Sequence, residues 1–451
     1  METTRTDQSL TGLLSGNRRA FLRATGTAFA ALAASGCAAR GGSLASAATA
    51  AGYGPLQPDP AGVLDLPIGF SYRVISRMGD AMSDGGTVPD RGDGMGCFAL
   101  PGGKIALVRN HELQPQHDAG GTVSAGYDVQ DGKAGAYLPG GTTTIVLDAR
   151  TLAVENQFRS LAGTIRNCAG GETPWGTWLS CEEDVSKAGG RLGKKHGYVF
   201  EVPANGTGAV NPVPLTAMGR FNHEAAAVDP ATGIIYETED REDSLLYRFI
   251  PKVPGKLAQG GKLQALVLEG ITDTRNWTGA NMSTGAWHAA RWVDIDNPDS
   301  DEDDLRKQGA AKGATLFARG EGIWMGEGEL YFCCTSGGAA KLGQIFSLKP
   351  MAGGPDMLQL FFESTSIDQF NYGDNLCVAP NGHLVVCEDQ YTDAVDNHLR
   401  GITPTGAPYT LGRLRMQTEL AGACFSPDGK TLFVNAYGPT TTFAITGPWI
   451  S

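Results

Sequence analysis

A recurring hairpin pattern constrains the fold of this 451-residue chain more than any other feature of its sequence. Each copy has an apolar strand, a turn rich in Pro, Gly, Asn or Asp, and a second apolar strand. Such turns between strand-forming residues predict β-hairpins. Clear copies span residues 98–108, 227–236, 377–386 and 424–434, and two weaker copies turn near residues 176 and 327. The 63 glycines and 24 prolines argue against a long helical bundle.

Six hairpins along one chain predict an all-β fold in which the hairpins are arranged radially. A six-bladed β-propeller is the simplest closure, and five or seven blades are the alternatives. We expect one propeller domain over residues 55–451, with loop and short-helix insertions at 114–140 and 251–313. The second insertion contains an acidic run, 294–304, which we interpret as a solvated loop, although its Asp-x-Asp start could bind Ca²⁺.

Residues 1–47 predict a twin-arginine (Tat) export signal. An Arg-Arg pair at 18–19 precedes an uncharged segment at 24–39, which is too short to span a bilayer core of about 30 Å comfortably. The alternative is a soluble amphipathic helix. The predicted signal could be processed at either of two places, an Ala-x-Ala cleavage site at 45–47 or a weak lipobox ending at Cys37. We therefore expect a periplasmic, extracellular or envelope-associated protein, which contacts the Tat translocase during export and the membrane only if Cys37 is lipidated.

Charge and cysteine usage exclude several other classes of protein. The formal net charge is −12, and no run of Lys or Arg is interleaved with aromatic residues, so sequence-led nucleic-acid binding is excluded. The nine cysteines form no C-x-x-C pair, which disfavours a zinc ribbon. Apart from Cys168, most lie in apolar strand patterns that predict buried free thiols, although export would permit disulfides. We expect a monomer.

Polar residues recur at nearly equal distances on either side of five of the turns. Residues placed in this way oppose each other at the open end of an antiparallel hairpin. The mirrored sets are Asp93 with Glu112, Cys168 with Glu182, Glu224 with Glu239, Arg319 and Glu321 with Thr335 and Cys333, and Asp374 with Glu388. In a propeller the open ends converge at the mouth of the central channel, so we expect these side chains to lie close together.

Carboxylates crowded in this way repel one another and need cations in order to coexist while buried. The sequence therefore predicts a multinuclear metal site, and the alternative is that each acid is solvent-exposed at a strand end. Many carboxylates favour Ca²⁺ or Mg²⁺, whereas the thiolate of Cys168 points to a transition metal such as iron. His111 and His223 lie next to proposed ligands, and the alternation of side chains along a strand turns them away from the channel.

The chain after about residue 55 resembles the PhoX-type alkaline phosphatases, which are Tat-exported, Ca²⁺-dependent phosphatases of bacteria. The most specific motif is the segment 167–183, NCAGGETPWGTWLSCEE. The other matching segments are NHE at 110–112, FNHE at 221–224, YETEDR at 236–241 with LYRF at 246–249, RGEG at 319–322, DN at 374–375 with CED at 387–389, and GACFSPDG at 422–429.

This resemblance implies a six-bladed propeller with a cluster of Fe³⁺ and Ca²⁺ ions at the channel mouth. It implies that Cys168 ligates iron. The carboxylates that it implies as iron or calcium ligands are Glu182, Glu224, Glu239, Glu321 and Glu388, with Asp374 and Glu112 as further candidates. Arg319 matches an arginine expected to hold phosphate oxygens, so Arg319 and Glu321 are the expected catalytic residues.

The expected function is hydrolysis of phosphate monoesters outside the cytoplasm, with a small phosphate ester as partner. The sequence has no G-x-S-x-G elbow and no Walker A loop, so a metal-centred nucleophile fits better than a covalent serine route. A Ca²⁺-dependent lactonase or esterase on the same fold is one alternative, and Cys168 together with Arg319 argues against it. A non-catalytic propeller with structural metals is the other alternative.

Overall fold

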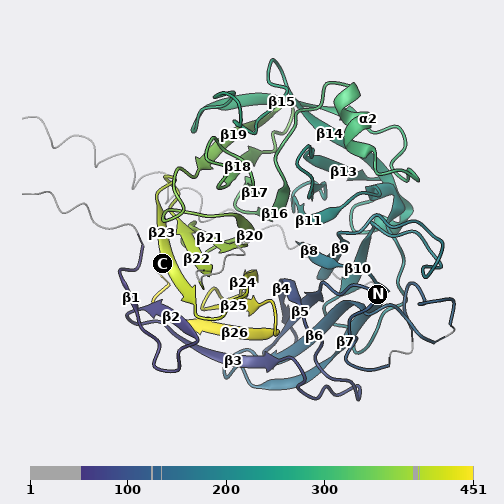
Figure 1. The fold of residues 1–451 in the computed structure, drawn as a ribbon, viewed down its shortest axis with the longest axis vertical. Helices are drawn as coiled ribbons and strands as arrows, with labels where there is room; N and C mark the ends of the chain where they lie inside the picture. The colour runs from purple at the N-terminus through teal and green to yellow at the C-terminus, as the bar shows by residue number, and fades with distance from the viewer. Residues whose placement is uncertain (1–51, 123–124, 134, 390–394, 396, 450–451) are drawn as a thin grey trace, which may run out of the picture. The chain divides into compact units, whose positions relative to one another are not determined.

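The hairpins predicted from the repeat are present as antiparallel strand pairs in the computed structural model (Figure 1). The structure describes residues 52–122, 125–133, 135–389, 395 and 397–449. The chain divides into two units, Met1–Thr49 and Ala50–Ser451, and every described residue belongs to the second. The predicted export signal at 1–47 therefore lies outside the described residues.

The first part of the domain forms three antiparallel meanders, in which each strand pairs with the next strand in sequence. Their strands are β4 (Gly92–Leu100), β5 (Lys104–His111), β6 (Gly140–Asp148) and β7 (Val154–Thr164), then β8 (Asn167–Glu172), β9 (Thr177–Glu182) and β10 (Val199–Pro203), then β11 (His223–Val228), β12 (Ile235–Glu239), β13 (Tyr247–Pro251) and β14 (Gly261–Leu268).

Three further meanders complete the domain. Their strands are β16 (Gly320–Met325), β17 (Leu330–Cys334), β18 (Gln344–Lys349) and β19 (Asp356–Glu363), then β20 (Gly373–Val378), β21 (Leu384–Glu388), β22 (Asn397–Ile402) and β23 (Pro408–Leu414), then β24 (Leu420–Phe425), β25 (Thr431–Ala436) and β26 (Thr441–Thr446). Strand β15 (Trp287–Asp294) pairs with β14 and β19 and thereby joins the third and fourth meanders into one nine-stranded sheet.

The N-terminal strands of the domain complete its last two sheets. Strand β3 (Ser71–Arg77) pairs with β26, and β2 (Leu64–Pro67) pairs with β23 and carries the short β1 (Leu56–Gln57). The beginning of the domain is thus hydrogen-bonded to its end. A propeller closed in this way does not leave the first and last meanders as free edges.

The first strands of the six meanders, here called the inner strands, lie around a common centre (Figure 1). Each contacts the next, in the order β4, β8, β11, β16, β20 and β24, and β24 contacts β4 again. The predicted all-β propeller is confirmed. Among the described residues, hydrogen bonding groups the strands into five sheets because β15 joins two meanders, whereas the inner strands number six.

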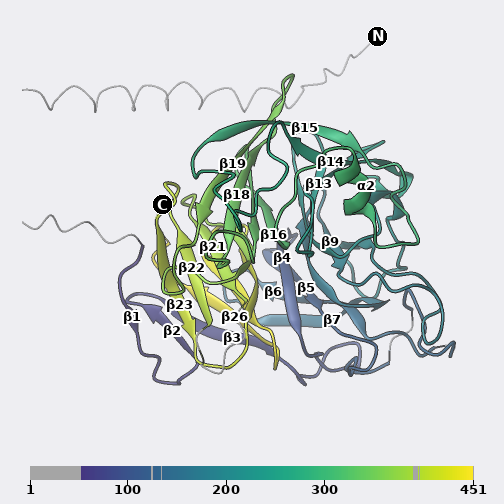
Figure 2. The same ribbon diagram turned by 45° about the horizontal axis from the view of Figure 1, so that its top comes forward.

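The segment 251–313 contributes strands as well as the expected loop and short helix. It contains β14 and β15, the 3₁₀ helix η3 (Leu257–Gln259) and the α-helix α2 (Leu305–Ala311). Helix α2 lies beside β13 and β14 in both views (Figures 1 and 2), and Leu305 joins the buried cluster of these strands. Another 3₁₀ helix, η2 (Thr216–Met218), precedes β11.

Apolar side chains fill the space between neighbouring sheets. One cluster joins Leu179 of β9 and Val199 of β10 to Phe249 of β13, and another joins Leu107 of β5 to Phe433 of β25. All five side chains are fully buried, so this packing fixes each meander against the next.

Within the described ranges, no helix is both long and apolar enough to cross a membrane.

Candidate metal centre at the channel mouth

Each inner strand begins with a β-bulge, a shift in its pairing with the second strand of the hairpin. A bulge places an extra residue on one strand and re-aims the side chains within it. The six bulges occupy equivalent positions, which gives the channel an approximate six-fold repetition. The first residues within them, here called the bulge ring, are Asp93, Cys168, Glu224, Glu321, Asp374 and Gly422.

The five side chains of the bulge ring converge on one another. The Cys168 Sγ lies 3.6 Å from Oδ2 of Asp93 and 3.5 Å from Oε1 of Glu224. Glu224, Glu321 and Asp374 each offer a carboxylate oxygen, and these three oxygens lie within 4.8 Å of one another. Five consecutive inner strands therefore bring four carboxyl groups and one thiol into a single buried cluster.

The sixth member of the bulge ring is a glycine because a side chain does not fit there. Gly422 has a φ of +65°, and a Cβ at this position would lie 2.2 Å from the carbonyl oxygen of Asp93. Its backbone N–H donates to Oδ1 of Asn375 at 2.7 Å. The ring is therefore asymmetric, with five donor side chains and one position occupied only by backbone.

Two further sets of equivalent residues surround the bulge ring. The residue after each second strand donates its backbone N–H to the carbonyl oxygen of a residue two positions before the bulge-ring residue, or three positions before it in the case of Gly422. The donors, here called the outer ring, are Glu112, Glu183, Asp240, Thr335, Asp389 and Tyr437. The acceptors, here called the leading residues, are Arg91, Arg166, Asn222, Arg319, Tyr372 and Glu419.

Two leading arginines hold carboxylates at the mouth. Arg319 donates from Nε to Oδ1 of Asp240 at 2.8 Å, and its Nη2 lies 2.9 Å from Oε1 of Glu321. Arg166 donates to Oε1 of Glu112 at 2.8 Å and to Oε2 of Glu183 at 2.6 Å. The carboxylates raise the pKa of both guanidinium groups, so both arginines are permanently charged.

Burial leaves the carboxyl groups of the bulge ring short of partners. Oδ1 of Asp93 and Oε2 of Glu224 are buried and have no hydrogen-bond partner in the described part of the chain. Burial, followed by repulsion from neighbouring carboxylates, raises the pKa values of Asp93, Glu224, Glu321 and Asp374 well above the ordinary range. A buried anion without a counter-charge is costly, so these groups either take up protons or bind cations.

The channel narrows directly beneath the bulge ring. Except for Asn375, the second residue of each bulge is Gly or Ala, and a Cβ on Gly94 or Gly322 would lie 2.4 to 2.7 Å from the backbone of the next inner strand. The space enclosed here is only about 20 Å³. The channel at this level therefore leaves little room for a substrate.

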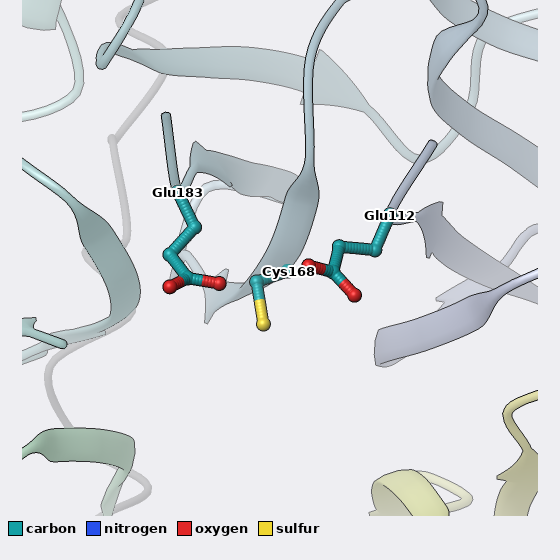
Figure 3. A group of neighbouring side chains, drawn as sticks. All are labelled: Glu112, Cys168 and Glu183. Carbon is teal, nitrogen blue, oxygen red and sulfur yellow. The ribbon is translucent and has the colours of Figure 1, made fainter. Parts of the chain in front are cut away.

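Six of the sequence-predicted site residues lie at the mouth. Glu224, Glu321 and Asp374 form one group of potential metal ligands, and Glu112, Cys168 and Glu183 form a second (Figure 3). Arg319 lies between Asp240 and Glu321. The structure thus brings together Glu112, Cys168, Glu224, Glu321, Asp374 and Arg319 from the predicted set.

The other three predicted ligands point into hydrogen-bonded pockets within their own meanders. Glu182 accepts backbone N–H bonds from Ile165, Gly197 and Tyr198 and lies 2.7 Å from His196 Nδ1.

Glu239 and Glu388 are held in the same way. Glu239 accepts the hydroxyl of Tyr247 at 2.8 Å, and Glu388 accepts Nε of Arg400 at 2.6 Å and the backbone N–H of Asn371 at 2.9 Å. The structure does not bring these two carboxylates, or that of Glu182, into the two groups of potential ligands. Their ligation of a metal remains a prediction.

The bulges explain this difference, because the mirrored pairs were counted as if the strands paired one to one. The structure pairs Asn167, rather than Cys168, with Glu182, and His223, rather than Glu224, with Glu239. It likewise pairs Gly92 with His111, Gly320 with Cys334, and Gly373 with Glu388. The residue that lies at the mouth beside each bulge-ring residue is therefore not the paired residue at the end of the second strand. It is the next residue, which belongs to the outer ring.

Sequence reasoning consequently missed Glu183, Asp240, Asp389 and Arg166, and left Asp93 out of the ligand set. The acids each directly follow a residue that was singled out, as in the pairs Glu182–Glu183, Glu239–Asp240 and Glu388–Asp389. Arg166 precedes the NCAGG motif by one residue. The repeated Arg-x-acid or Arg-x-Cys spacing at 91–93, 166–168 and 319–321 is the signal that could have identified it.

The eight described cysteines are all buried and free, as the strand patterns predict for most of them. Cys168 differs from the rest because its thiol contacts two carboxylates. His111 and His223 also lie away from the bulge ring. His111 contacts Thr143 and the Asp90 carbonyl, and His223 lies 3.3 Å from Glu237.

Together these features define a class of protein, an all-β propeller with a buried ring of carboxylates and a thiol at its channel mouth and arginines beside them. The sequence matches the alkaline phosphatase PhoX family over residues 51–155 and 149–440, and the chain belongs to that family. The predicted family is confirmed, and with it the prediction that the protein is a phosphatase enzyme. No curated protein sequence matches the chain.

Among solved structures, the fold is similar to that of PhoX from Pseudomonas fluorescens in complex with vanadate, a transition state analogue. The TM-score is 0.66 at 19% identity, covering 86% of this chain and 96% of that one. Weaker matches include a gluconolactonase from Xanthomonas campestris, with a TM-score of 0.39 at 16% identity over 88% of this chain and 98% of that one. A protein of unknown function from Dyadobacter fermentans has a TM-score of 0.45 at 10% identity, with 84% and 100% covered.

Proposed function

We propose that this protein hydrolyses phosphate monoesters with the help of Ca²⁺ and Fe³⁺ ions held at the channel mouth. The bulge ring is the observation that carries the proposal. Buried carboxyl groups from four inner strands converge with one thiol, which lies 3.5 and 3.6 Å from two of them, and three of the carboxylate oxygens lie within 4.8 Å of one another. Two of the carboxylate oxygens, on Asp93 and Glu224, have no hydrogen-bond partner in the described ranges. Such a cluster is stable in its ionised form only with cations among its members.

The donor set fits the metals that the family implies. Asp93, Glu224, Glu321 and Asp374 offer hard carboxylate oxygens, which suit Ca²⁺. Cys168 offers a soft thiolate, which suits iron. When bound, these ions supply the Lewis acidity that offsets negative charge on the phosphate oxygens.

Arg319 binds and orients the phosphate group in this proposal. Asp240 and Glu321 engage its Nε and Nη2, and no protein acceptor in the described part of the chain contacts its Nη1. The side chain is 29% exposed, so it can donate to a ligand at the mouth. A guanidinium held by two carboxylates keeps a fixed orientation, which suits bidentate recognition of a phosphate.

Hydrolysis of p-nitrophenyl phosphate before and after metal removal tests this function. We expect activity in the native protein, loss of activity after treatment with EGTA and an iron chelator, and recovery after Ca²⁺ and Fe³⁺ are added back. Hydrolysis that survives complete removal of both metals, verified by elemental analysis, contradicts the proposal. Parallel assays with a phosphate diester test the preference for monoesters.

We also propose that the protein acts outside the cytoplasm after export by the Tat pathway, as a monomer with a small phosphate ester as its partner. The Arg-Arg pair at 18–19 and the uncharged segment that follows support this proposal. Replacing both arginines, Arg18→Lys and Arg19→Lys, should retain the protein in the cytoplasm in a fractionation experiment. An unchanged distribution contradicts Tat export, and mass spectrometry of the mature N-terminus distinguishes cleavage at 45–47 from lipidation of Cys37.

A further inference from the structure

The three arginines among the leading residues make equivalent contacts. Each contacts the outer-ring residue of the preceding hairpin, so Arg91 donates to Tyr437 at 2.8 Å, Arg166 to Glu112 at 2.8 Å and Arg319 to Asp240 at 2.8 Å. All three have a positive φ, between 47° and 56°. Non-glycine residues rarely adopt this conformation, so the surrounding structure must hold it in place.

Arg166 differs from Arg319 in that protein acceptors occupy every nitrogen of its guanidinium. Nε donates to Oε1 of Glu112 at 2.8 Å, and Nη2 donates to Oε2 of Glu183 at 2.6 Å. Nη1 donates to the backbone carbonyl of Glu183 at 2.9 Å. These contacts and that between Nη2 and Oε1 of Glu112 at 2.8 Å use four of the five N–H groups, so at most one, on Nη1, remains for a phosphate. Bidentate phosphate binding therefore does not follow from the position that Arg166 shares with Arg319.

The carboxylates that Arg166 holds are part of a potential metal site. Glu112, Cys168 and Glu183 offer three donor atoms within 4.8 Å of one another, and Figure 3 shows Cys168 between the two carboxylates. A guanidinium and a divalent cation at this position would compete for the same oxygens and repel each other. The ion pairs with Arg166 therefore help to decide whether metal binds in the group of Glu112, Cys168 and Glu183 or only in the bulge ring.

We propose that Arg166 is a positioning residue that supplies the positive charge between Glu112 and Glu183 in place of a divalent cation. The metal ions are then confined to the bulge ring, where Cys168 faces Asp93 and Glu224. This inference rests on the proposed function, because it assumes that the mouth binds cations.

Backbone contacts fix Arg166 on both sides. Its N–H donates to the carbonyl oxygen of Leu113 at 3.0 Å, and its carbonyl oxygen accepts the N–H of Glu183 at 2.8 Å. Unlike a bound ion, this charge cannot be removed by a chelator. The Glu112–Arg166–Glu183 arrangement should therefore persist in metal-free protein.

Metal content per chain, measured by elemental mass spectrometry after equilibration with Ca²⁺, tests the proposal. The variant Arg166→Met frees both carboxylates beside Cys168, and we expect it to bind one more equivalent of Ca²⁺ than the native protein. The double variant Arg166→Met, Glu112→Gln should lose this additional equivalent. The variant Arg91→Met is the matched control, because Arg91 contacts a tyrosine rather than two carboxylates, and it should leave the ion count unchanged.

The same content, or a lower one, in folded Arg166→Met protein overturns the inference. Should that variant fail to fold, as judged by circular dichroism, Glu112→Gln in the otherwise native chain decides the matter. The proposal predicts no loss of metal in that variant, because glutamine still accepts a hydrogen bond from Arg166, whereas loss of one equivalent identifies Glu112 as a ligand and overturns the inference. A native protein without any bound metal instead contradicts the proposed function.

Discussion

Glu172, a partly buried glutamate, allows a physical premise of the metal site, that a carboxylate shielded from water is costly without a cation, to be measured away from the metal centre. It ends β8, the strand that begins beside Cys168. Its Oε1 accepts the backbone N–H of Cys97 at 2.7 Å, and no other protein donor or cation contacts the carboxylate within the described residues. Burial raises the pKa of Glu172 to about 7 from 4.5, and the single hydrogen bond offsets only part of the shift.

This shift fixes both the sign and the size of the effect. Below pH 4.5 the carboxyl group is protonated in the folded and unfolded states, so it costs nothing. Above pH 7 it is ionised in both states, and the folded state carries the full penalty. At about 1.4 kcal/mol per pKa unit, the penalty is about 3 kcal/mol at pH 8 and less than about 1 kcal/mol at pH 5.

The variant Glu172→Gln removes the charge and keeps the shape. We expect it to be more stable than the native protein by about 3 kcal/mol at pH 8 and by under about 1 kcal/mol at pH 5, in denaturant unfolding of metal-free samples. Glu155→Gln is the control, because this exposed glutamate pairs with Lys104 at the surface and should change stability by less than about 1 kcal/mol. A Glu172→Gln variant that gains no stability at pH 8, or gains equally at both pH values, would show that the ionised carboxylate of Glu172 does not destabilise the folded state.

Three further substitutions test individual parts of the site. Arg319→Lys should lower kcat/KM for p-nitrophenyl phosphate about 100-fold, because lysine cannot keep the contacts to Asp240 and Glu321 while donating bidentately to phosphate; a change below about threefold contradicts its role. Cys168→Ser should reduce the iron content and leave Ca²⁺ in place, measured by elemental analysis; an unchanged iron content contradicts the ligation of iron by the Cys168 thiolate. Gly422→Ala should destabilise the protein by at least about 2 kcal/mol in denaturant unfolding, because its Cβ would clash with the Asp93 backbone at a positive φ; native stability would show that the channel wall can move.

The radial fold could be predicted from the sequence because each hairpin is specified by residues that are close together in the chain. Turn residues such as those at 101–103 and 427–429 specify hairpins by themselves, and repetition of hairpins leaves few ways of closing the chain. The convergence of Cys168, Glu224, Glu321 and Asp374 follows from the same logic.

The parts that could not be predicted depend on contacts between distant segments. The bulge at the start of each inner strand is set by packing against neighbouring inner strands, and it moves each pairing by one residue, so that Glu183 rather than Glu182 reaches the mouth. The partner of Arg166, Glu112, lies 54 residues away in another meander. Strand β15 lies in a segment that the sequence predicts to be an insertion, and its pairing with β19, which joins two meanders, is a contact between distant segments.

The central claim is that cations sit among the carboxyl groups of the bulge ring. Elemental analysis of protein purified without chelators, alongside the variant Glu224→Gln, tests it most directly, because Glu224 contacts Cys168 and belongs to the group with Glu321 and Asp374. We expect bound Ca²⁺ and iron in the native protein and loss of at least one ion in the variant. A native protein that holds neither metal, or a folded variant with the native metal content, contradicts it.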